Sequence, residues 1–211
     1  DGTGMPLVAY SEAVLERIRQ ELVTTALDLM AKQGIQHTTL EQIYQAVVIS
    51  RTFFYSFFPA KEDLIVETLY LQQPRILAYV RQLAEDPSLS WREAVTRFLY
   101  DCCYGERSGI AVLTVEEQQM LFRRLSPESY RTFREKQGRL FGEILKGFGI
   151  RPDRERISLF TNISLTAMIV RRAIPATMPL FVPEAADATV DFQSRAIVDC
   201  LERLRASDAG T

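Results

Sequence analysis

The sequence is poor in the residues on which most enzyme and metal sites depend. Its 211 residues include one histidine, His37, and three cysteines, Cys102, Cys103 and Cys200. The cysteines are odd in number and lack CxxC spacing, so we expect no metal site and three reduced, mostly buried thiols. His37 is expected in an exposed loop. Without a Gly-rich phosphate loop, a GxSxG motif or a spaced acid pair, the sequence indicates neither an enzyme nor a cofactor.

Long apolar runs and an excess of positive charge are also missing. No segment approaches the ~20 uninterrupted apolar residues that span a bilayer, so we predict no membrane partner and a cytoplasmic location. Residues 1–10 are predicted to be a disordered leader, with Asp1–Gly4 as a cloning remnant. The chain has 25 Lys and Arg against 27 Asp and Glu. Any nucleic acid must therefore be bound through a few well-placed contacts rather than by long-range attraction.

Helical periodicity is present along the whole chain, without an alternating strand pattern. With 47% hydrophobic residues, the chain can bury one sizeable core and a small satellite domain. The first helix is predicted over about residues 11–33, because Leu22, Ala26, Leu29 and Met30 recur at helical spacing. Gly34 then offers a left-handed C-cap.

Two short helices joined by a tight turn are predicted next. Thr38 has Glu41 three residues on and Thr39 has Gln42, so either threonine can open a helix with a capping box. This helix should end near Ala46, because the β-branched residues 47–49 follow. Ser50 is a new N-cap, and in the helix after it an aromatic face is buried, formed by Phe54, Phe57 and Phe58. Such a three-helix unit is typical of proteins whose last helix enters the DNA major groove.

These segments in this order resemble the TetR family of bacterial transcriptional regulators. The resemblance covers the first third of the chain and is carried by Glu21–Gly34, Thr38–Ile43 and Ser50–Leu64. It implies a ligand-responsive DNA-binding regulator, in most cases a repressor that a small effector releases from a palindromic operator. It also implies a homodimer formed through the last two helices. Phosphate contacts are implied for Thr39, Tyr55, Ser56 and Lys61, and base contacts for Arg51, Thr52 and Phe53.

Four positions depart from the family pattern. Tyr44 stands where a small residue is usual, Val48 replaces the glycine of the turn, and Ala60 replaces a capping Ser or Thr. If the turn requires a positive φ, Val48 is strained there. Phe53 replaces a polar residue, and it either touches a thymine methyl or packs in the core.

The rest of the chain is predicted to be a helical bundle. The helices are expected over about residues 60–83, 90–104, 110–124, 126–148, 153–172 and 188–205, with a Pro-rich connection over 174–183. Pro74 should kink or break the first of them. We therefore predict an all-α fold of about nine helices. Residues 11–59 form the helix-turn-helix DNA-binding domain, and residues 60–211 form the effector-binding and dimerisation domain.

The helix over residues 157–170 is apolar almost all round, so it must be covered on both sides. One side can meet its own domain and the other a second copy of the chain. A central place in a monomeric bundle is the alternative. The predicted dimer interface consists of Leu165, Met168, Ile169, Phe192, Ala196, Ile197 and Leu201.

A cavity between the helices would suit a lipophilic or aromatic effector. Its predicted ligand-binding residues are Phe98, Cys102, Met120, Phe133, Phe141, Phe160, Asn162 and Thr166. Each aromatic residue has core packing as its alternative, and Asn162 and Thr166 have hydrogen bonds within the protein. A cationic ligand would need a carboxylate, for which Asp101, Glu116 and Glu117 are candidates.

The expected mechanism couples two equilibria. Effector binding shifts the helix that begins near residue 60, the two DNA-reading heads of the dimer become wrongly spaced, and the operator is released. The alternative is a helical homodimeric interaction or ligand-binding module with degenerate DNA binding. The acidic balance of the head and the unusual Tyr44 and Val48 favour that alternative.

Overall fold

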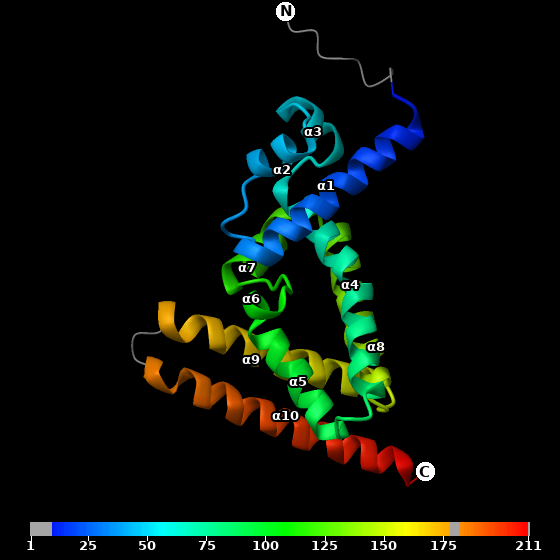
Figure 1. The fold of residues 1–211 in the computed structure, drawn as a ribbon, viewed down its shortest axis with the longest axis vertical. Coiled ribbons are helices and arrows are strands. Elements are labelled where there is room, and N and C mark those ends of the chain that lie inside the picture. The colour runs from blue at the N-terminus through cyan, green and yellow to red at the C-terminus, as the bar shows by residue number, and fades with distance from the viewer. Residues whose placement is uncertain (1–9, 178–181, 211) are drawn as a thin grey trace, which may run out of the picture.

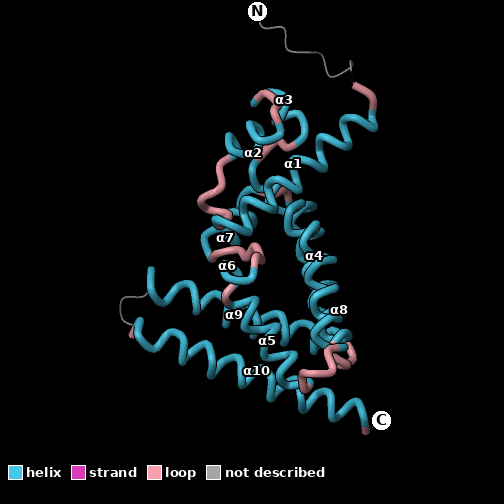
Figure 2. The backbone as a smooth tube through the Cα atoms, in the orientation of Figure 1, coloured by secondary structure: helices cyan, strands magenta, loops and turns pink. Residues whose placement is uncertain are grey.

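The computed structural model describes residues 10–177 and 182–210, and most of them are helical (Figure 1, Figure 2). Within these residues there is no strand, and the helices run from α1 to α10 with α6 a single turn of four residues. The predicted all-α fold is therefore confirmed. The predicted leader lies, up to residue 9, outside the described residues. None of the described helices combines the length and the apolar character needed to cross a bilayer.

Three helices form the amino-terminal head: α1 (Glu12–Gln33), α2 (Leu40–Val47) and α3 (Arg51–Phe57). Of the two candidate capping boxes, the one between Thr39 and Gln42 forms. The buried Thr38 hydroxyl instead donates to the Gly34 carbonyl at 2.8 Å. Gly34 has a φ of 87° but a ψ of 152°, so it ends α1 without the predicted left-handed helical conformation.

Helix α4 (Lys61–Glu85) leads from the head into the rest of the chain. Pro74 lies inside this continuous helix, so the predicted break there is wrong. A helix interior tolerates a proline when packing on both sides holds the flanking turns. Ala60 is the N-cap of α4 and makes no side-chain hydrogen bond there, because a methyl group can neither donate nor accept one.

The remaining helices form the body. They are α5 (Trp91–Cys103), α6 (Gly105–Ser108), α7 (Val115–Arg124), α8 (Pro127–Gly147), α9 (Arg154–Thr177) and α10 (Ala186–Ala209), with a 3-10 turn at Pro183–Ala185. The predicted helix over residues 110–124 is wrong at its start. Gly109 has a φ of 72° and ends α6, and Thr114 then caps α7, so residues 110–114 form a loop. In Figure 1, α9 and α10 lie side by side and α5 crosses them.

Two hydrophobic cores lie on either side of the middle of α4. The first holds the head together with α7 and Phe133 of α8, and it includes Leu64, Ile65 and Leu69 of α4. The second lies among α5, α8, α9 and α10 and includes Val80 and Leu83 of the same helix. Both ends of α4 are therefore fixed by apolar packing, each to a different part of the molecule.

A half-exposed ion pair crosses from α7 to the start of α4. The Glu62 side chain is 4% exposed and its carboxylate accepts a hydrogen bond from the Arg124 guanidinium at 3.1 Å, while Arg124 is 66% exposed. A buried carboxylate that loses its charged donor pays the full cost of desolvation. The pair therefore contributes to the contact between head and body.

Replacing Arg124 by Met should lower the free energy of unfolding by about 1.5–3 kcal/mol, because Glu62 is left buried without a charged partner. Chemical denaturation of the full chain measures this change. Arg123→Met is the matched control, since Arg123 is exposed on the same turn of α7. Equal stability of the two variants would contradict a role for the pair.

Candidate nucleic-acid interface and ligand cavity

Helix α3 lies at the end of the head remote from the body (Figure 1). Its N-cap is Ser50, whose hydroxyl accepts the Phe53 N–H at 3.1 Å. Phe54 and Phe58 are completely buried and anchor α3 against α1 and α2. The opposite face of α3 is polar and exposes Arg51, Thr52, Tyr55 and Ser56, although the Ser56 hydroxyl donates to the Phe53 carbonyl at 2.5 Å and must turn away from it to reach a phosphate.

Three of the predicted DNA-contacting residues, Arg51, Tyr55 and Phe53, have rings or charges packed against them within the head. The guanidinium carbon of Arg51 lies 5.7 Å from the centre of the Tyr55 ring, which orients both side chains on one face. Phe53 is half-buried, with its ring stacked on Tyr10 at 5.4 Å. Only part of the Phe53 ring is therefore available to a base.

The two predicted phosphate contacts outside α3 are also hydrogen-bonded within the head. Thr39 is exposed, and its hydroxyl oxygen accepts the Gln42 N–H at 3.2 Å, so its O–H can still donate outward. The Lys61 ammonium donates to the Thr38 carbonyl at 2.7 Å and to the Ile35 carbonyl at 3.4 Å. An ammonium has three N–H donors, so one remains for a phosphate.

The turn between α2 and α3 requires a positive φ at Val48, the case in which the sequence predicts strain. Val48 has φ 63° and ψ 49°, the left-handed conformation, and it is 87% exposed. It is the only described residue other than glycine with a positive φ. Its N–H donates to the Gln45 carbonyl and the next N–H to the Tyr44 carbonyl, so the turn keeps its hydrogen bonds at the expense of strain in Val48.

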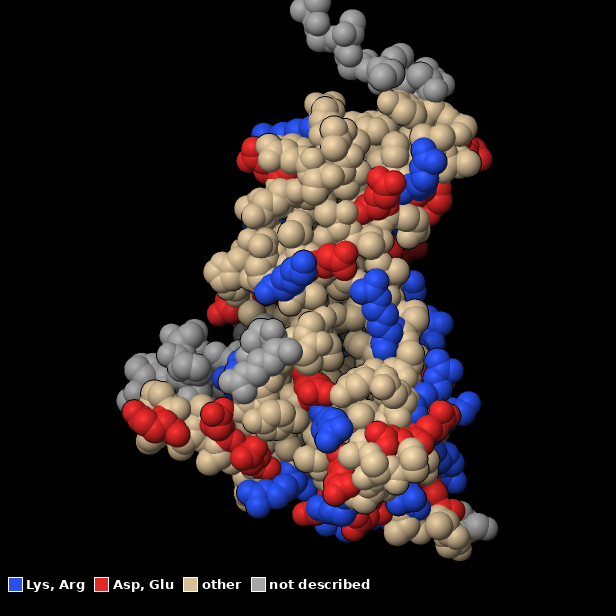
Figure 3. All heavy atoms as spheres, in the orientation of Figure 1, with Lys and Arg blue, Asp and Glu red and all other residues tan. Residues whose placement is uncertain are grey.

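Charge does not gather on the head. In Figure 3, acidic and basic side chains are interspersed over the visible face of the head. Within the described part of the chain, no group of three or more His, Cys, Asp or Glu could hold a metal ion. The candidate interface is thus defined by the shape and exposure of α3 rather than by a basic patch.

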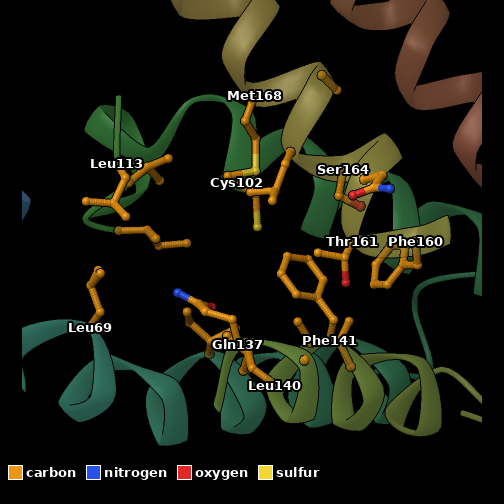
Figure 4. Close-up of a pocket in the computed structure, with 18 of the residues that line it drawn as sticks. Leu69, Cys102, Leu113, Gln137, Leu140, Phe141, Phe160, Thr161, Ser164 and Met168 are labelled. Atoms are coloured by element: carbon orange, nitrogen blue, oxygen red, sulfur yellow. The ribbon is translucent and has the colours of Figure 1, made fainter. Parts of the chain in front are cut away.

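A cavity of about 610 Å³ lies in the body between α4, α5, α8, α9 and the loop before α7 (Figure 4). The volume is that of a drug-sized ligand site. The cavity is lined mainly by apolar and aromatic side chains. Six of the eight predicted ligand-binding residues line it: Phe98, Cys102, Phe133, Phe141, Phe160 and Asn162.

Two predicted ligand-binding residues are wrong. Met120 on α7 does not line the cavity, and neither does Thr166. Thr166 is exposed, and its hydroxyl donates to the Asn162 carbonyl one turn earlier at 2.7 Å. None of the three acidic candidates Asp101, Glu116 and Glu117 lines the cavity either. Asp101 accepts a hydrogen bond from the Tyr79 hydroxyl instead.

The sequence prediction missed the polar lining of the cavity. Gln72 on α4, Gln137 on α8, Thr161 and Ser164 on α9 and Ser194 on α10 are all lining residues. Thr161 and Ser164 are three residues apart and share a face, so helical spacing could have found them as a pair. Of the predicted pair, Asn162 lines the cavity and Thr166 lies on the neighbouring, outer face of α9.

The cysteines are free, as predicted, although only Cys103 is fully buried. The Cys102 sulfur points into the cavity (Figure 4). Burial raises the pKa of the Cys103 thiol to about 11 and raises the pKa of Cys102 further. Both thiols are therefore neutral at physiological pH, and the cavity presents a soft apolar sulfur rather than a thiolate.

Six of the seven predicted dimer residues have described side chains, and these fall into three groups. Phe192 and Ala196 are exposed on α10, as an interface requires, with Phe192 68% exposed. Ile197 and Leu201 are buried in the core of the chain itself, so the prediction is wrong for these two. Leu165 and Met168 line the cavity, and Met168 points into it, so these side chains turn inward (Figure 4). The side chain of Ile169 lies outside the described residues.

Comparison with known families and proteins shows what the amino-terminal part of the chain is similar to. Residues 22–68 match the family model described as bacterial regulatory proteins, tetR family. The HTH-type transcriptional regulator TcmR of Streptomyces glaucescens is 33% identical over 98 residues, 46% of this chain and 43% of that protein. The "Probable acrEF/envCD operon repressor" of Escherichia coli (strain K12) is 34% identical over 82 residues, 36% of this chain and 37% of that protein. The matched segments span less than half of each relative.

Solved structures share the fold over nearly the whole chain. A TetR transcriptional regulator from Legionella pneumophila has a TM-score of 0.51 at 19% identity, covering 88% of this chain and 95% of that one. A TetR-family transcriptional regulator from Streptomyces coelicolor has a TM-score of 0.50 at 20% identity, covering 90% of this chain and 97% of that one. The fold similarity therefore includes the body as well as the head.

Replacing Val48 by Gly should raise the free energy of unfolding by about 1 kcal/mol, because glycine adopts the left-handed conformation without steric cost. The melting temperature should rise by about 2–4 °C, as thermal unfolding will show. Val47→Gly is the control, since Val47 is the last residue of α2 and glycine should destabilise it there. A Val48→Gly protein that melts at a lower temperature would show that the turn is not strained.

Proposed function

We propose that this chain, which belongs to the TetR family of bacterial regulatory proteins through its amino-terminal domain, is a homodimeric transcriptional regulator. It binds a palindromic DNA operator and releases the operator when a small, mainly apolar effector enters the body. The main support for this proposal is that α4 contacts both the head and the cavity. One end of this helix packs under the DNA-reading head and its middle lines the cavity.

The polar face of α3 supports DNA reading. Arg51 and Thr52 at its start are exposed and meet the base edges, where an arginine can bond a guanine through two donors. Thr39, Tyr55, Ser56 and Lys61 contact phosphates and set the position of the head on the duplex. Because the chain has no basic excess, these contacts must be doubled by a second copy to give useful affinity.

The outer face of α9 and α10 supports dimerisation. On α10 the large apolar side chain of Phe192 is exposed, with Ala196 one turn away, and Leu159 is exposed near the start of α9. Large exposed apolar side chains on neighbouring helices are typical of a protein–protein interface. A twofold pair formed there presents two α3 helices to successive major grooves, about 34 Å apart, as a palindromic operator requires.

A buried amide connects the cavity to α4 and supports the coupling of effector to operator. Gln72 is buried in the middle of α4, and its Nε2 donates to the Ala111 carbonyl at 3.0 Å. The Ala111 N–H donates back to Gln72 Oε1 at 2.7 Å. Ala111 lies in the loop that lines the cavity, so an effector that displaces this loop must also displace α4 or break both bonds.

A second candidate function is a homodimeric ligand-binding module that has lost DNA binding. The strained Val48 turn directly before α3 favours it, together with the mixed charge of the head. The two candidates differ in one property only, which is whether α3 recognises a duplex.

Replacing Arg51 by Ala should weaken binding to the DNA upstream of the chain's own gene at least tenfold, because a base contact worth about 1–3 kcal/mol is lost in each half-site. Fluorescence anisotropy of a labelled duplex gives the affinity. Arg123→Ala removes an exposed arginine of the body and should leave the affinity unchanged. If the unaltered protein selects no duplex, either from this region or from a random library, the second candidate is correct.

Replacing Phe192 by Glu should convert the dimer into a monomer, because a carboxylate would be buried without a partner in the interface. Sedimentation at micromolar concentration distinguishes the two states. Phe122→Glu is the matched control, since Phe122 is 64% exposed but lies on α7. A Phe192→Glu protein that remains dimeric would place the interface elsewhere.

A further inference from the structure

The cavity contains buried hydroxyl groups that find no hydrogen-bond partner among the described residues. The oxygen atoms of Thr161, Ser164 and Ser194 are closed off from solvent and form no hydrogen bond. Ser164 is 5% exposed and Ser194 is 3% exposed. All three residues line the cavity, two from α9 and one from α10. A buried polar group without a partner is costly, and one that is retained calls for an explanation.

Two other hydroxyls of α9, Ser158 at the cavity edge and Thr166 outside it, are hydrogen-bonded within the helix. Ser158 donates to the Arg154 carbonyl at 2.8 Å and Thr166 to the Asn162 carbonyl at 2.7 Å, one turn back in each case. Serine and threonine in helices often satisfy themselves in this way. Thr161 and Ser164 on the same helix do not, so their hydroxyls remain available at the cavity wall.

A fourth polar group enters the cavity from another helix. The Gln137 amide of α8 projects into the cavity, and Thr161 and Ser164 lie at one end of it near Phe141 and Phe160 (Figure 4). Rotation about one side-chain bond turns a serine hydroxyl toward the space between them. The walls between these polar groups are aromatic or aliphatic.

The charge of the lining restricts the ligand further. Among the described residues no Asp or Glu lines the cavity, and Arg134 is the sole cation, exposed at the rim. A cation would therefore enter without a counter-charge, and the one lining cation that an anion could meet among the described residues is the solvent-exposed Arg134. Neutral hydroxyls and an amide match a neutral oxygen, which can both donate and accept.

We propose that the ligand of this cavity is a neutral polycyclic aromatic compound with at least one hydroxyl or carbonyl oxygen. One oxygen bonds the Gln137 amide and the Thr161 hydroxyl, and any further oxygens of the ligand bond the hydroxyls of Ser164 and Ser194. The rings pack against Phe98, Phe141 and Phe160. This inference rests on the proposed function only in naming the class of effector, since the binding itself requires no DNA.

Three probes of one ring size test the proposal: 9-hydroxyfluorene, fluorene and fluorene-9-carboxylate. Their affinities for the full chain are measured by titration calorimetry without DNA. The alcohol should bind about 3- to 10-fold more tightly than fluorene, as a net hydrogen bond allows. It should also bind at least about tenfold more tightly than the carboxylate, which must be desolvated without a cation. Equal affinities for the alcohol and fluorene, tighter binding of the carboxylate, or no binding of any probe would each overturn the proposal.

Variants then test whether Gln137 and Thr161 cause the preference for the alcohol over fluorene. Gln137→Leu should bring the alcohol and fluorene to nearly equal affinity, and Gln119→Leu, an exposed glutamine of α7, should not. Thr161→Val should reduce the preference, whereas Thr166→Val on the outer face of α9 should leave it intact. A preference that survives both Gln137→Leu and Thr161→Val would contradict the proposed subsite.

The stability of the empty protein supplies an independent measurement. Thr161→Val removes an unpaired buried hydroxyl without changing the shape of the side chain, so the melting temperature should rise by about 2 °C. A fall would show that the hydroxyl has a structural partner. Since none of these experiments uses DNA, a failure of operator binding leaves them unaffected, and their failure leaves operator binding unaffected.

Discussion

The paired hydrogen bonds between the Gln72 amide and the backbone of Ala111 join α4 to the wall of the cavity. The Gln72 amide is buried in the middle of α4, so it needs both a hydrogen-bond donor and an acceptor. The backbone of Ala111 supplies both. On one side of Gln72, α4 belongs to the core of the head, and on the other side it belongs to the core of the body. The helix therefore cannot move relative to one core without disturbing the other or breaking this pair.

This constraint gives a physical basis for regulation in a protein of low overall charge. Closely packed cores change between discrete arrangements rather than deforming continuously. We propose that a ligand that separates α9 from α8 also displaces the cavity wall that contains Ala111, and through it α4 and the head. The strained turn at Val48 lies between α2 and α3, so any gain from DNA contact must also hold that turn in place.

Local signals in the sequence were sufficient to predict where several helices begin. Ser50, Ser90 and Ser126 each cap the helix that follows them, as predicted from the serine itself, from Glu93 three residues after Ser90 and from Pro127 after Ser126. The strain at Val48 also followed from the sequence, because a β-branched residue occupies a position that suits glycine. These features depend on interactions within about four residues, which a sequence displays directly.

Features that depend on the orientation of a whole helix were less predictable. Helix α9 is apolar around most of its circumference, so its sequence does not indicate which face meets the cavity. Thr166 was therefore predicted to bind the ligand although it faces outward, and Thr161 and Ser164 were missed. The same uncertainty placed Ile197 and Leu201 in a dimer interface when they complete the core. The bond between Gln72 and Ala111 joins residues 39 positions apart and has no local signature.

Hydrogen exchange with and without operator DNA tests the coupling through α4 most directly, since it needs no knowledge of the effector. If the operator and the cavity bias the same equilibrium, DNA binding must change the cavity wall as well as the head. We predict altered exchange in the residue 105–114 segment and around Gln72, and no such change for Arg51→Ala with the same duplex. Changes confined to the head, with the 105–114 segment unaffected by bound DNA, would contradict the account.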